Sequence, residues 1–427
     1  MTVTLGRRDV AVLKVSDGRR TGRVGAGRYA EAMPGVFERL VGQRDVETEL
    51  TAAATAARGG GAGSRMTHSW LFTGPPGSGR SIAALCFAAA LQCTDATAPG
   101  CGHCHACSTT MAGTHGDVRR VIPEGLTISV KAMRDIVRTA SRRPSTGQWQ
   151  VVVIEDADRL TEGAANALLK VVEEPPERTV FLLCAPSIDP QDISVTLRSR
   201  CRHVALVTPS PDAIARVLRE RDGLDAETAS WAASISGGHV GRARRLATDE
   251  SARASRRRAL DLAEAVLRPA TTYTAADELV QRAEAEAKEI SVARDERETE
   301  ELRTALGAGG TGKGAAGALR GAAGVLKDLE RTQKSRRTRT ERDIMDRALI
   351  DLAGLYRDAL ARSLGASGTA NHPDMAERAS DLASRARPEA LLTCIEAILE
   401  CREVLAQNVK PRFAVAAMAS RLSSAFR

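Results

Sequence analysis

The chain has 427 residues, 43 % of them hydrophobic, and carries a formal net charge of +8 at pH 7. This length favours two to four domains, with enough apolar side chains for a sizeable core. Aromatic residues are only 3 % of the chain, which argues against a platform that stacks the bases of single strands. Apolar runs stay below the ~18 residues of a membrane helix, and the N-terminus lacks a signal-peptide core, so we expect a cytoplasmic protein with no membrane contact.

Residues 1–33 are rich in glycine and arginine and contain seven Lys/Arg against three Asp/Glu. They show no sustained hydrophobic period, which predicts a flexible basic tail. An upstream start, with Met33 as the true first residue, is the alternative. The rest of the chain is only mildly basic, so charge by itself does not establish a nucleic-acid partner.

A helix is predicted over residues 43–57, and the stretch Trp70 to Ser81, WLFTGPPGSGRS, predicts a phosphate-binding loop (P-loop). Its first half is typical of a short buried strand, its middle is a glycine-rich turn, and an Ala- and Leu-rich helix follows. Glycines let backbone N–H groups point into one concavity, to which the helix N-terminus adds positive dipole. The candidate phosphate-binding residues are Gly74, Pro75, Gly77, Ser78, Gly79, Arg80 and Ser81.

Arg80 stands where the GxxxxGK[ST] pattern requires lysine. A lysine ammonium is a compact point charge, whereas a guanidinium is larger and planar. Arg80 can still contact phosphate, but we expect it not to fit the same cradle. The sequence therefore predicts that the backbone fold of the loop is retained and argues against efficient ATP hydrolysis. It does not decide whether ATP and Mg²⁺ bind.

Four cysteines follow the predicted helix, and three of them fall in a C-x2-C-x2-C pattern. Together they are Cys93, Cys101, Cys104 and Cys107. Four thiolates satisfy tetrahedral Zn²⁺. A ferredoxin-like cluster would need a further Cys-Pro three residues on, which this sequence lacks. We therefore predict a structural zinc knuckle over residues 93–107, with free thiols or another metal as the alternatives.

The continuous apolar run Val151 to Ile154 predicts a strand buried on both faces of a parallel sheet. Glu155 and Asp156 follow it directly. Acidic residues at such a strand end hold Mg²⁺ and orient water in P-loop NTPases, but their usual order, Asp then Glu, is reversed here. The alternative is that these acids cap the next helix.

Strands and helices alternate up to about residue 207, and helices follow alone. We predict three domains, over residues 34–207, 208–250 and 251–427. A Gly/Ala-rich insertion at about 304–324 contains a second GxxxxGK, which lacks both the following hydroxyl and a preceding strand and is interpreted as linker. The basic run Lys334 to Arg339 is interpreted as a solvated helix face, with a contact to DNA backbone as the alternative.

The order of these motifs resembles the bacterial clamp-loader AAA+ subunits of DNA polymerase III. The signature residues are Asn166 to Pro176, NALLKVVEEPP, and Ser199-Arg200-Cys201. The resemblance is strong over residues 33–246 and weak beyond them. Delta-prime-type subunits are the most similar, since gamma/tau-type subunits would keep GK[ST] in the loop and Asp-Glu at the strand end.

The resemblance implies an α/β fold: an AAA+ P-loop domain with a parallel sheet, a small helical lid and a C-terminal all-α collar domain. Ser187 falls where the family places a polar residue that senses the γ-phosphate. Gly241 falls where an active subunit carries a sensing arginine, with Arg242 adjacent. Arg200 would reach the ATP site of a neighbouring subunit and stabilise charge on the γ-phosphoryl oxygens.

The resemblance also implies partners: gamma/tau and delta subunits in a hetero-oligomeric ring, which opens a sliding clamp and places it on primed DNA. We weigh three hypotheses. The leading one is an interaction subunit that donates Arg200 and hydrolyses little ATP itself. The second is an active ATPase of the same ring, and the third is a zinc-dependent nucleic-acid binder.

Overall fold

The computed structural model describes residues 35–59, 66–306, 315–366, 368–407 and 409–427. The predicted tail 1–33 and the second glycine-rich loop, 307–314, lie outside these residues. None of the helices described is long and apolar enough to cross a membrane. The domain boundaries given above stay predictions.

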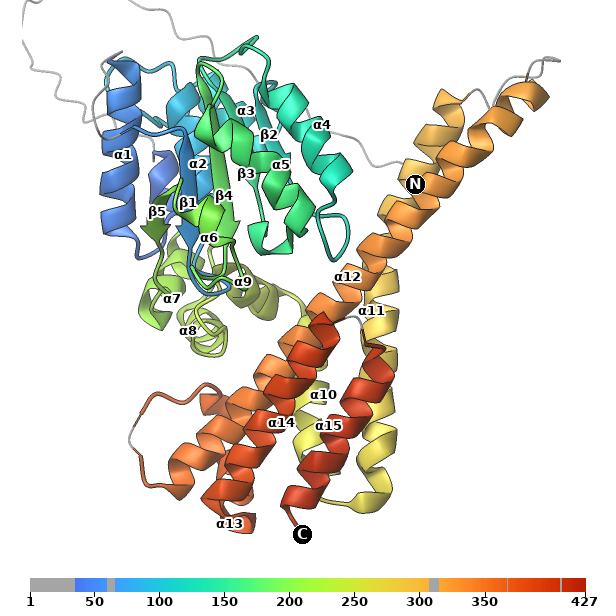
Figure 1. Ribbon diagram of the computed structural model, residues 1–427. Helices are drawn as coiled ribbons and strands as arrows, with labels where there is room; N and C mark the ends of the chain where they lie inside the picture. Colours follow the sequence, from blue (N-terminus) through green and yellow to red (C-terminus); the bar gives the residue numbers. More distant parts are fainter. Residues whose placement is uncertain (1–34, 60–65, 307–314, 367, 408) are drawn as a thin grey trace, which may run out of the picture. The chain divides into compact units, whose positions relative to one another are not determined.

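A five-stranded parallel sheet forms the first part of the molecule (Figure 1). The strands are β1 (Ser69–Thr73), β2 (Val118–Val121), β3 (Gln150–Ile154), β4 (Thr179–Ala185) and β5 (Arg202–Ala205). Their order is β2-β3-β4-β1-β5, and Leu71 of β1 lies between Leu183 of β4 and His203 of β5. The predicted parallel sheet is confirmed, and it places the strand that precedes the glycine-rich loop inside the sheet, with a neighbour on each side.

Both faces of the sheet are buried, because successive side chains of a strand point to opposite faces. In β4, Val180, Leu182 and Cys184 pack on one face, whereas Phe181, Leu183 and Ala185 pack on the other. Helices α1 (Arg44–Arg58) and α2 (Arg80–Gln92) contribute to the first layer, and α4 (Val130–Ala140) and α5 (Glu162–Glu173) to the second (Figure 1). This double burial explains the continuous apolar strands of the sequence.

Short elements complete this part of the chain. They are η1 (Val36–Arg39), α3 (His105–Ala112), η2 (Ala157–Arg159) and α6 (Val195–Arg198). Helix boundaries follow local capping: the hydroxyl of Ser129 accepts a hydrogen bond from the Ala132 N–H at the start of α4, and that of Thr161 accepts one from Ala164 at the start of α5.

Three helices with a small core of their own follow, as predicted. They are α7 (Pro211–Glu220), α8 (Ala226–Ser234) and α9 (Val240–Thr248). Ile214, Leu218 and Leu246 are buried among the alanines of α8 and α9. This short helical segment leads directly into the C-terminal helices.

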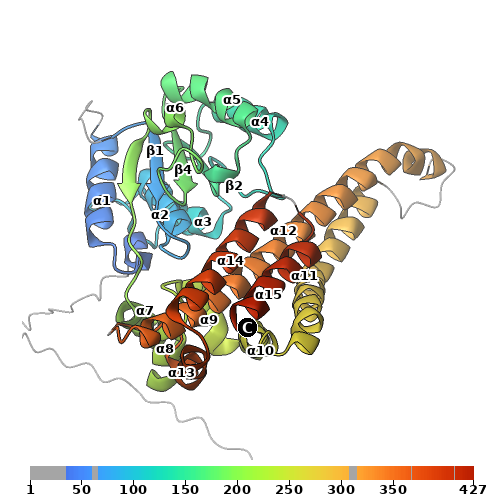
Figure 2. The ribbon, with the colours of Figure 1, turned by 60° about the horizontal axis from the view of Figure 1, so that its bottom comes forward.

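The C-terminal part is entirely helical within the described residues, which confirms the all-α prediction (Figure 2). Its elements are α10 (Glu250–Ala265), α11 (Pro269–Ala305), α12 (Ala315–Ser363), η3 (Pro373–Met375), α13 (Ala376–Arg385), α14 (Pro388–Ala406) and α15 (Pro411–Ala425). One core, with Leu349, Tyr356 and Ile398 at its centre, unites them. Since α12 already begins at Ala315, helix extends into the second half of the predicted glycine-rich insertion.

The basic run Lys334 to Arg339 is not a solvated face throughout, so that interpretation is wrong for two of its arginines. Arg336 pairs with Asp295 and Glu298, and Arg339 pairs with Asp156, at 2.5 to 2.7 Å. Their side chains are only 13 % and 16 % exposed. Sequence periodicity could not reveal these pairs, because the partners lie 38 to 183 residues away along the chain.

Candidate functional site

The glycine-rich loop has the geometry of a phosphate cradle. The N–H of Gly74 donates to the Pro186 carbonyl at 3.1 Å, which ties the start of the loop to the residue after β4. Gly77 and Gly79 have φ values of 91° and 95°, a left-handed backbone that other residues rarely adopt. Helix α2 begins at Arg80, so its N-terminal N–H groups face the loop.

A cavity of about 790 Å³ lies against this loop. The loop residues Gly77, Ser78, Gly79, Arg80 and Ser81 line it, whereas Gly74 and Pro75 do not. The opposite walls come from residues 35–41, from α7 and from the first turn of α9. The volume and the converging basic groups suit an anionic ligand of nucleotide size.

The electrostatic character of the cavity is basic. Its lining includes the four arginines Arg39, Arg80, Arg221 and Arg244, and Glu38 is the one acidic residue among the described lining residues. Arg244 pairs with Asp222 at 2.6 Å, which lies outside the lining. Within the part of the chain that the structure describes, no carboxylate pairs with Arg80.

Two polar atoms of the cradle are buried and lack a hydrogen-bond partner among the residues that the structure describes: the hydroxyl of Ser78 and one Nη atom of Arg80. Buried polar groups without partners cost free energy unless a ligand or water satisfies them. The residues present therefore fit a phosphate group. The substitution of lysine by arginine leaves a cation in the cradle, although with different hydrogen-bond geometry.

The acidic pair after β3 is engaged elsewhere. Glu155 accepts hydrogen bonds from Arg120 at 2.7 and 3.0 Å, and Asp156 accepts one from Arg339 at 2.5 Å. Neither residue lines the cavity at the loop. Asp156 precedes η2 without forming a side-chain cap, so the alternative role in helix capping is not seen for it.

Of the candidate sensing residues, neither Ser187 nor Arg242 lines the cavity at the loop. The hydroxyl of Ser187 donates to Asp192 at 2.7 Å and accepts the N–H of Asp189. Gly241 lines the cavity, but its neighbour Arg242 does not, because the guanidinium of Arg242 pairs with Asp351 of α12. Arg242 is therefore turned away from the P-loop cavity, whereas Arg244 of the same helix lines it.

The four predicted cysteines come together in space. Cys93 ends α2, Cys101 and Cys104 lie in the following loop, and Cys107 lies in α3; their sulfur atoms are all within 4.8 Å of one another. Cys104 and Cys93 have sulfur atoms 3.9 Å apart. A tetrahedral Zn²⁺ with bonds of about 2.3 Å would place its sulfur ligands about 3.8 Å apart, so these residues fit the metal.

Backbone N–H groups donate to three of the four sulfur atoms of this cluster. The N–H of Cys101 points to the sulfur of Cys93, that of Cys104 to the sulfur of Cys101, and that of Cys107 to the sulfur of Cys104, at 3.3 to 3.5 Å. Burial opposes ionisation of Cys104, but hydrogen bonds from Thr94 and Cys107 outweigh it and lower the pKa of this thiol to about 6. An Asp95–Cys101–His103 group shares one cysteine with this cluster, and its His103 is exposed.

Two cysteines outside this cluster are core thiols. Cys86 and Cys184 are buried in the core beside the sheet. Burial raises the pKa of the Cys86 thiol to about 12.

Arg200 lies at the surface, just before β5. Its side chain is 36 % exposed, and its guanidinium pairs with Glu173 at 2.5 Å and donates to the Thr196 carbonyl at 2.9 Å. Both Glu173 and Arg200 belong to the motifs that carry the resemblance. The structure therefore presents Arg200 outward, where another molecule can reach it, and away from its own P-loop cavity, whose lining does not include it.

Sequence reasoning missed two residues that shape the loop. Gln43 is buried, and its amide donates to the carbonyls of Ser78 and Val207 while accepting the N–H of Val207. His239 packs so closely on the loop that a Cβ on Gly77 would meet its Cβ at 2.5 Å. The turn Gly237-Gly238-His239 indicates a helix start, but only the tertiary fold brings His239 against Gly77 of the P-loop.

Comparisons with known proteins agree with the motifs. Residues 58–210 match the family model described as "DNA polymerase III, delta subunit". The chain is 35 % identical over 176 residues to DNA polymerase III subunit delta' of Escherichia coli, covering 40 % of this chain and 50 % of that protein. It is 34 % identical over 175 residues to subunit tau of Bacillus subtilis, covering 41 % of this chain and 29 % of that protein.

Among solved structures, a gamma subunit-related protein of Thermotoga maritima aligns over 89 % of this chain and all of its own, with a TM-score of 0.39 and 16 % identity. The chain spans half or less of the length of the two curated relatives named above. The predicted resemblance is confirmed over the matched segment, residues 58–210. Over residues 58–210, the chain is thus similar to clamp-loader subunits of DNA polymerase III of the delta-prime and gamma/tau types.

Proposed function

We propose that this protein is a delta-prime-type clamp-loader subunit that donates Arg200 to the ATP site of a neighbouring subunit and hydrolyses little or no ATP itself. The observation that carries the proposal is the exposed guanidinium of Arg200, which Glu173 holds at the surface. In that role the protein serves as a stator in a ring with gamma/tau and delta subunits. The ring loads a sliding clamp on primed DNA during replication.

We expect weak ATP hydrolysis because Glu155 and Asp156 are each already paired with an arginine. A P-loop NTPase needs a carboxylate near the cradle to hold Mg²⁺ and a second group to orient water. Here Glu155 and Asp156 are paired with Arg120 and Arg339, and breaking those pairs would cost free energy before either acid could serve. Arg242, paired with Asp351, likewise supplies no charge to a γ-phosphate.

Nucleotide binding without turnover is compatible with the cradle. Ser78 and Arg80 each offer a buried polar atom that lacks a partner among the described residues, and Ser81 supplies the hydroxyl of the GxxxxGK[ST] pattern. Bound ATP would place its phosphates against the loop N–H groups and the start of α2. Mg²⁺, when bound with the nucleotide, would offset phosphate charge.

Arg200 acts on a neighbour by electrostatics. A guanidinium brought to the γ-phosphoryl group stabilises the charge that spreads over its oxygens, and such arginines contribute roughly 10³ to 10⁵ in rate in well-studied cases. Glu173 keeps the guanidinium at the surface before assembly, and the surface exposure of both groups makes this pair weak enough to exchange for phosphate. The zinc knuckle serves structure, by holding the end of α2 to α3.

The test is Arg200→Ala in a reconstituted loader with clamp and primed DNA. We expect DNA-stimulated ATP hydrolysis and clamp loading to fall at least tenfold while assembly of the ring is retained. Arg198→Ala is a matched control, because Arg198 is exposed two residues away and donates only to the Ile188 carbonyl. Wild-type rates with the Arg200 variant would show that the proposed role is wrong.

The unsatisfied atoms of the cradle also favour a second candidate, an active ATPase subunit of the same ring. Steady-state hydrolysis by the isolated chain separates the two. Turnover that Arg80→Ala abolishes would establish the active subunit, whereas absence of turnover together with retained nucleotide binding supports the stator.

A further inference from the structure

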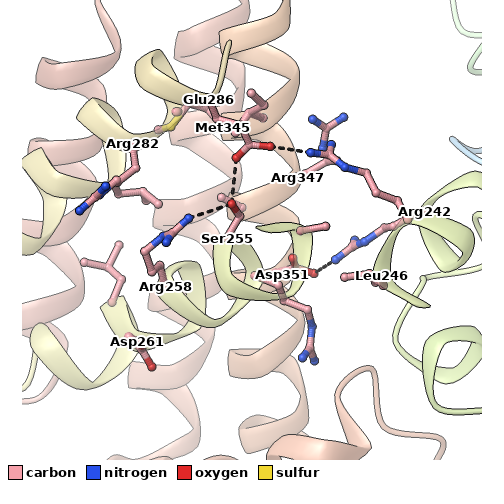
Figure 3. Close-up of a pocket in the computed structure, with 18 of the residues that line it drawn as sticks. Arg242, Leu246, Ser255, Arg258, Asp261, Arg282, Glu286, Met345, Arg347 and Asp351 are labelled. Atoms are coloured by element: carbon pink, nitrogen blue, oxygen red, sulfur yellow. Dashed lines mark hydrogen bonds and ion pairs between the residues drawn. The ribbon is translucent and has the colours of Figure 1, made fainter. Parts of the chain in front are cut away.

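A second cavity lies among helices α9, α10, α11 and α12 (Figure 3). Its lining excludes the P-loop residues and Arg200, although it shares His239 and Gly241 with the lining of the P-loop cavity. Its volume is about 480 Å³, within the range of sites for small organic molecules. None of the proposed roles above uses it. Its walls combine apolar side chains with several arginines and carboxylates.

The apolar part of the wall comes from all four helices. It includes Leu246 of α9, Leu262 of α10, Leu279 of α11, and Ile344 and Met345 of α12. Four of these side chains are buried, with exposures from 0 % for Met345 to 8 % for Ile344. A ligand that covered them would gain about 25 cal/mol for each Å² of apolar surface removed from water.

Most charged groups of the wall are neutralised within the protein. Arg242 pairs with Asp351, and Glu286 accepts hydrogen bonds from Arg245 and Ser255, each at 2.8 Å (Figure 3). Arg256 is paired with Asp374 at 2.7 Å. Arg258 and Arg282 are exposed and therefore hydrated.

Arg347 is the exception. Its side chain is partly buried, and within the described residues its guanidinium forms no hydrogen bond or ion pair. Burial lowers the pKa of Arg347, and the nearby guanidinium groups of Arg245 and Arg242 lower it further, against the opposing attraction of Asp343 and Glu286. A desolvated cation without a hydrogen-bonded partner is costly, so an anion placed beside it would be stabilised.

We propose that this cavity binds a small amphiphilic anion, with an apolar body packed among Leu246, Leu279 and Met345 and a single carboxylate or sulfonate group on Arg347. One partly buried guanidinium without a partner among the described residues, together with an apolar wall, suits one negative charge. A polyphosphate would leave further charges in apolar surroundings. The site is thus distinct in chemistry from the basic cavity at the P-loop.

The probe for the test is 8-anilinonaphthalene-1-sulfonate, which has an aromatic body and one sulfonate, titrated against the full chain and followed by fluorescence. We expect saturable binding with one probe per chain, displaced by decanoate and not by ADP. Arg347→Met should weaken binding about tenfold or more, because it removes a charge-assisted contact. Arg357→Met is the control, since Arg357 is exposed on the same helix and lies outside the cavity.

A second variant keeps the proposal testable if Arg347→Met fails to fold. Ala275→Leu fills the cavity from α11 without touching the charge, and should weaken binding while the thermal midpoint stays at the wild-type value. Equal affinity in wild type and in the folded Arg347→Met variant would overturn the proposal. Displacement by ADP would do the same, because it would place the probe at the P-loop cavity.

Discussion

Replacing Arg256 by methionine should destabilise the C-terminal helices strongly. Arg256 of α10 is only 4 % exposed, and its two Nη atoms donate to the two carboxylate oxygens of Asp374 at 2.7 and 2.8 Å. One of them also donates to Nδ1 of His372 at 2.8 Å, whose Nε2 lies 2.9 Å from the Asp351 carbonyl. A methionine of similar length keeps the packing of the stem but removes every one of these bonds.

The magnitude follows from burial. Removing one partner of a buried ion pair costs about 3 to 5 kcal/mol, because the other charge stays buried without compensation. Asp374 keeps 20 % exposure and can be partly hydrated, so we expect the lower end, about 3 kcal/mol. For a helical unit of this size, that corresponds to a fall in thermal midpoint of about 6 to 12 °C.

Differential scanning calorimetry of the full chain measures this loss, with urea unfolding as a second readout. Arg385→Met is the matched control: its ion pair with Asp381 is exposed by 55 % and 49 %, so its loss should cost at most about 0.5 kcal/mol. If the two variants lost the same stability, the reasoning from burial would be refuted.

Three further predictions concern the metal cluster, a buried carboxylate and the P-loop. Cys104→Ser should release one equivalent of zinc per chain, measured by plasma emission spectrometry. The control Cys401→Ala in α14 should release none. A wild-type protein that is folded and metal-free would contradict the site. Asp117 is buried, and burial raises the pKa of its carboxyl, but hydrogen bonds from Ser145, Thr146 and Gly147 outweigh this and hold the pKa well below its ordinary value. The stability that this carboxylate contributes is therefore fully present above about pH 4 and is lost as the pH falls further. Asp117→Asn should lower the free energy of unfolding by about 2 kcal/mol at pH 7 and by much less in acid. An equal cost at both pH values in urea titrations would disprove this account. Gly77→Ala should reduce nucleotide affinity and stability more than Gly223→Ala. Both glycines have positive φ, but only a Cβ at Gly77 meets His239. Equal losses in calorimetry and nucleotide titration would show that the close approach of His239 to Gly77 is unimportant.

The sequence predicted local elements well where the signal is local. The helix predicted over residues 43–57, the P-loop strand and helix, and the buried strand β3 each depend on residues within a few positions of one another. The cysteine spacing was equally informative, because three ligands of the cluster lie in seven consecutive residues.

Contacts between distant residues were out of reach of that reasoning. The pairing of Asp156 with Arg339 joins residues 183 positions apart, and the contact of Gln43 with Val207 joins residues 164 positions apart. Both alter the site: the first engages an acid expected at a metal, and the second fixes the loop beside β5. Without other sequences to compare, no pattern in a single chain indicates such pairs.

The sequence by itself determined the order of strands and helices, the glycine-rich turn with arginine in place of lysine, and the four-thiol cluster, since hydrophobic period, turn chemistry and ligand spacing are properties of neighbouring residues. The tertiary structure alone decided which charges are free to act. Arg200 stays at the surface and Arg347 faces a cavity without a hydrogen-bonded partner, whereas Glu155, Asp156 and Arg242 are neutralised by distant side chains. The interactions that a charge can make depend on its exposure to water and on its ion-pair partners, and both are set only when remote segments pack together.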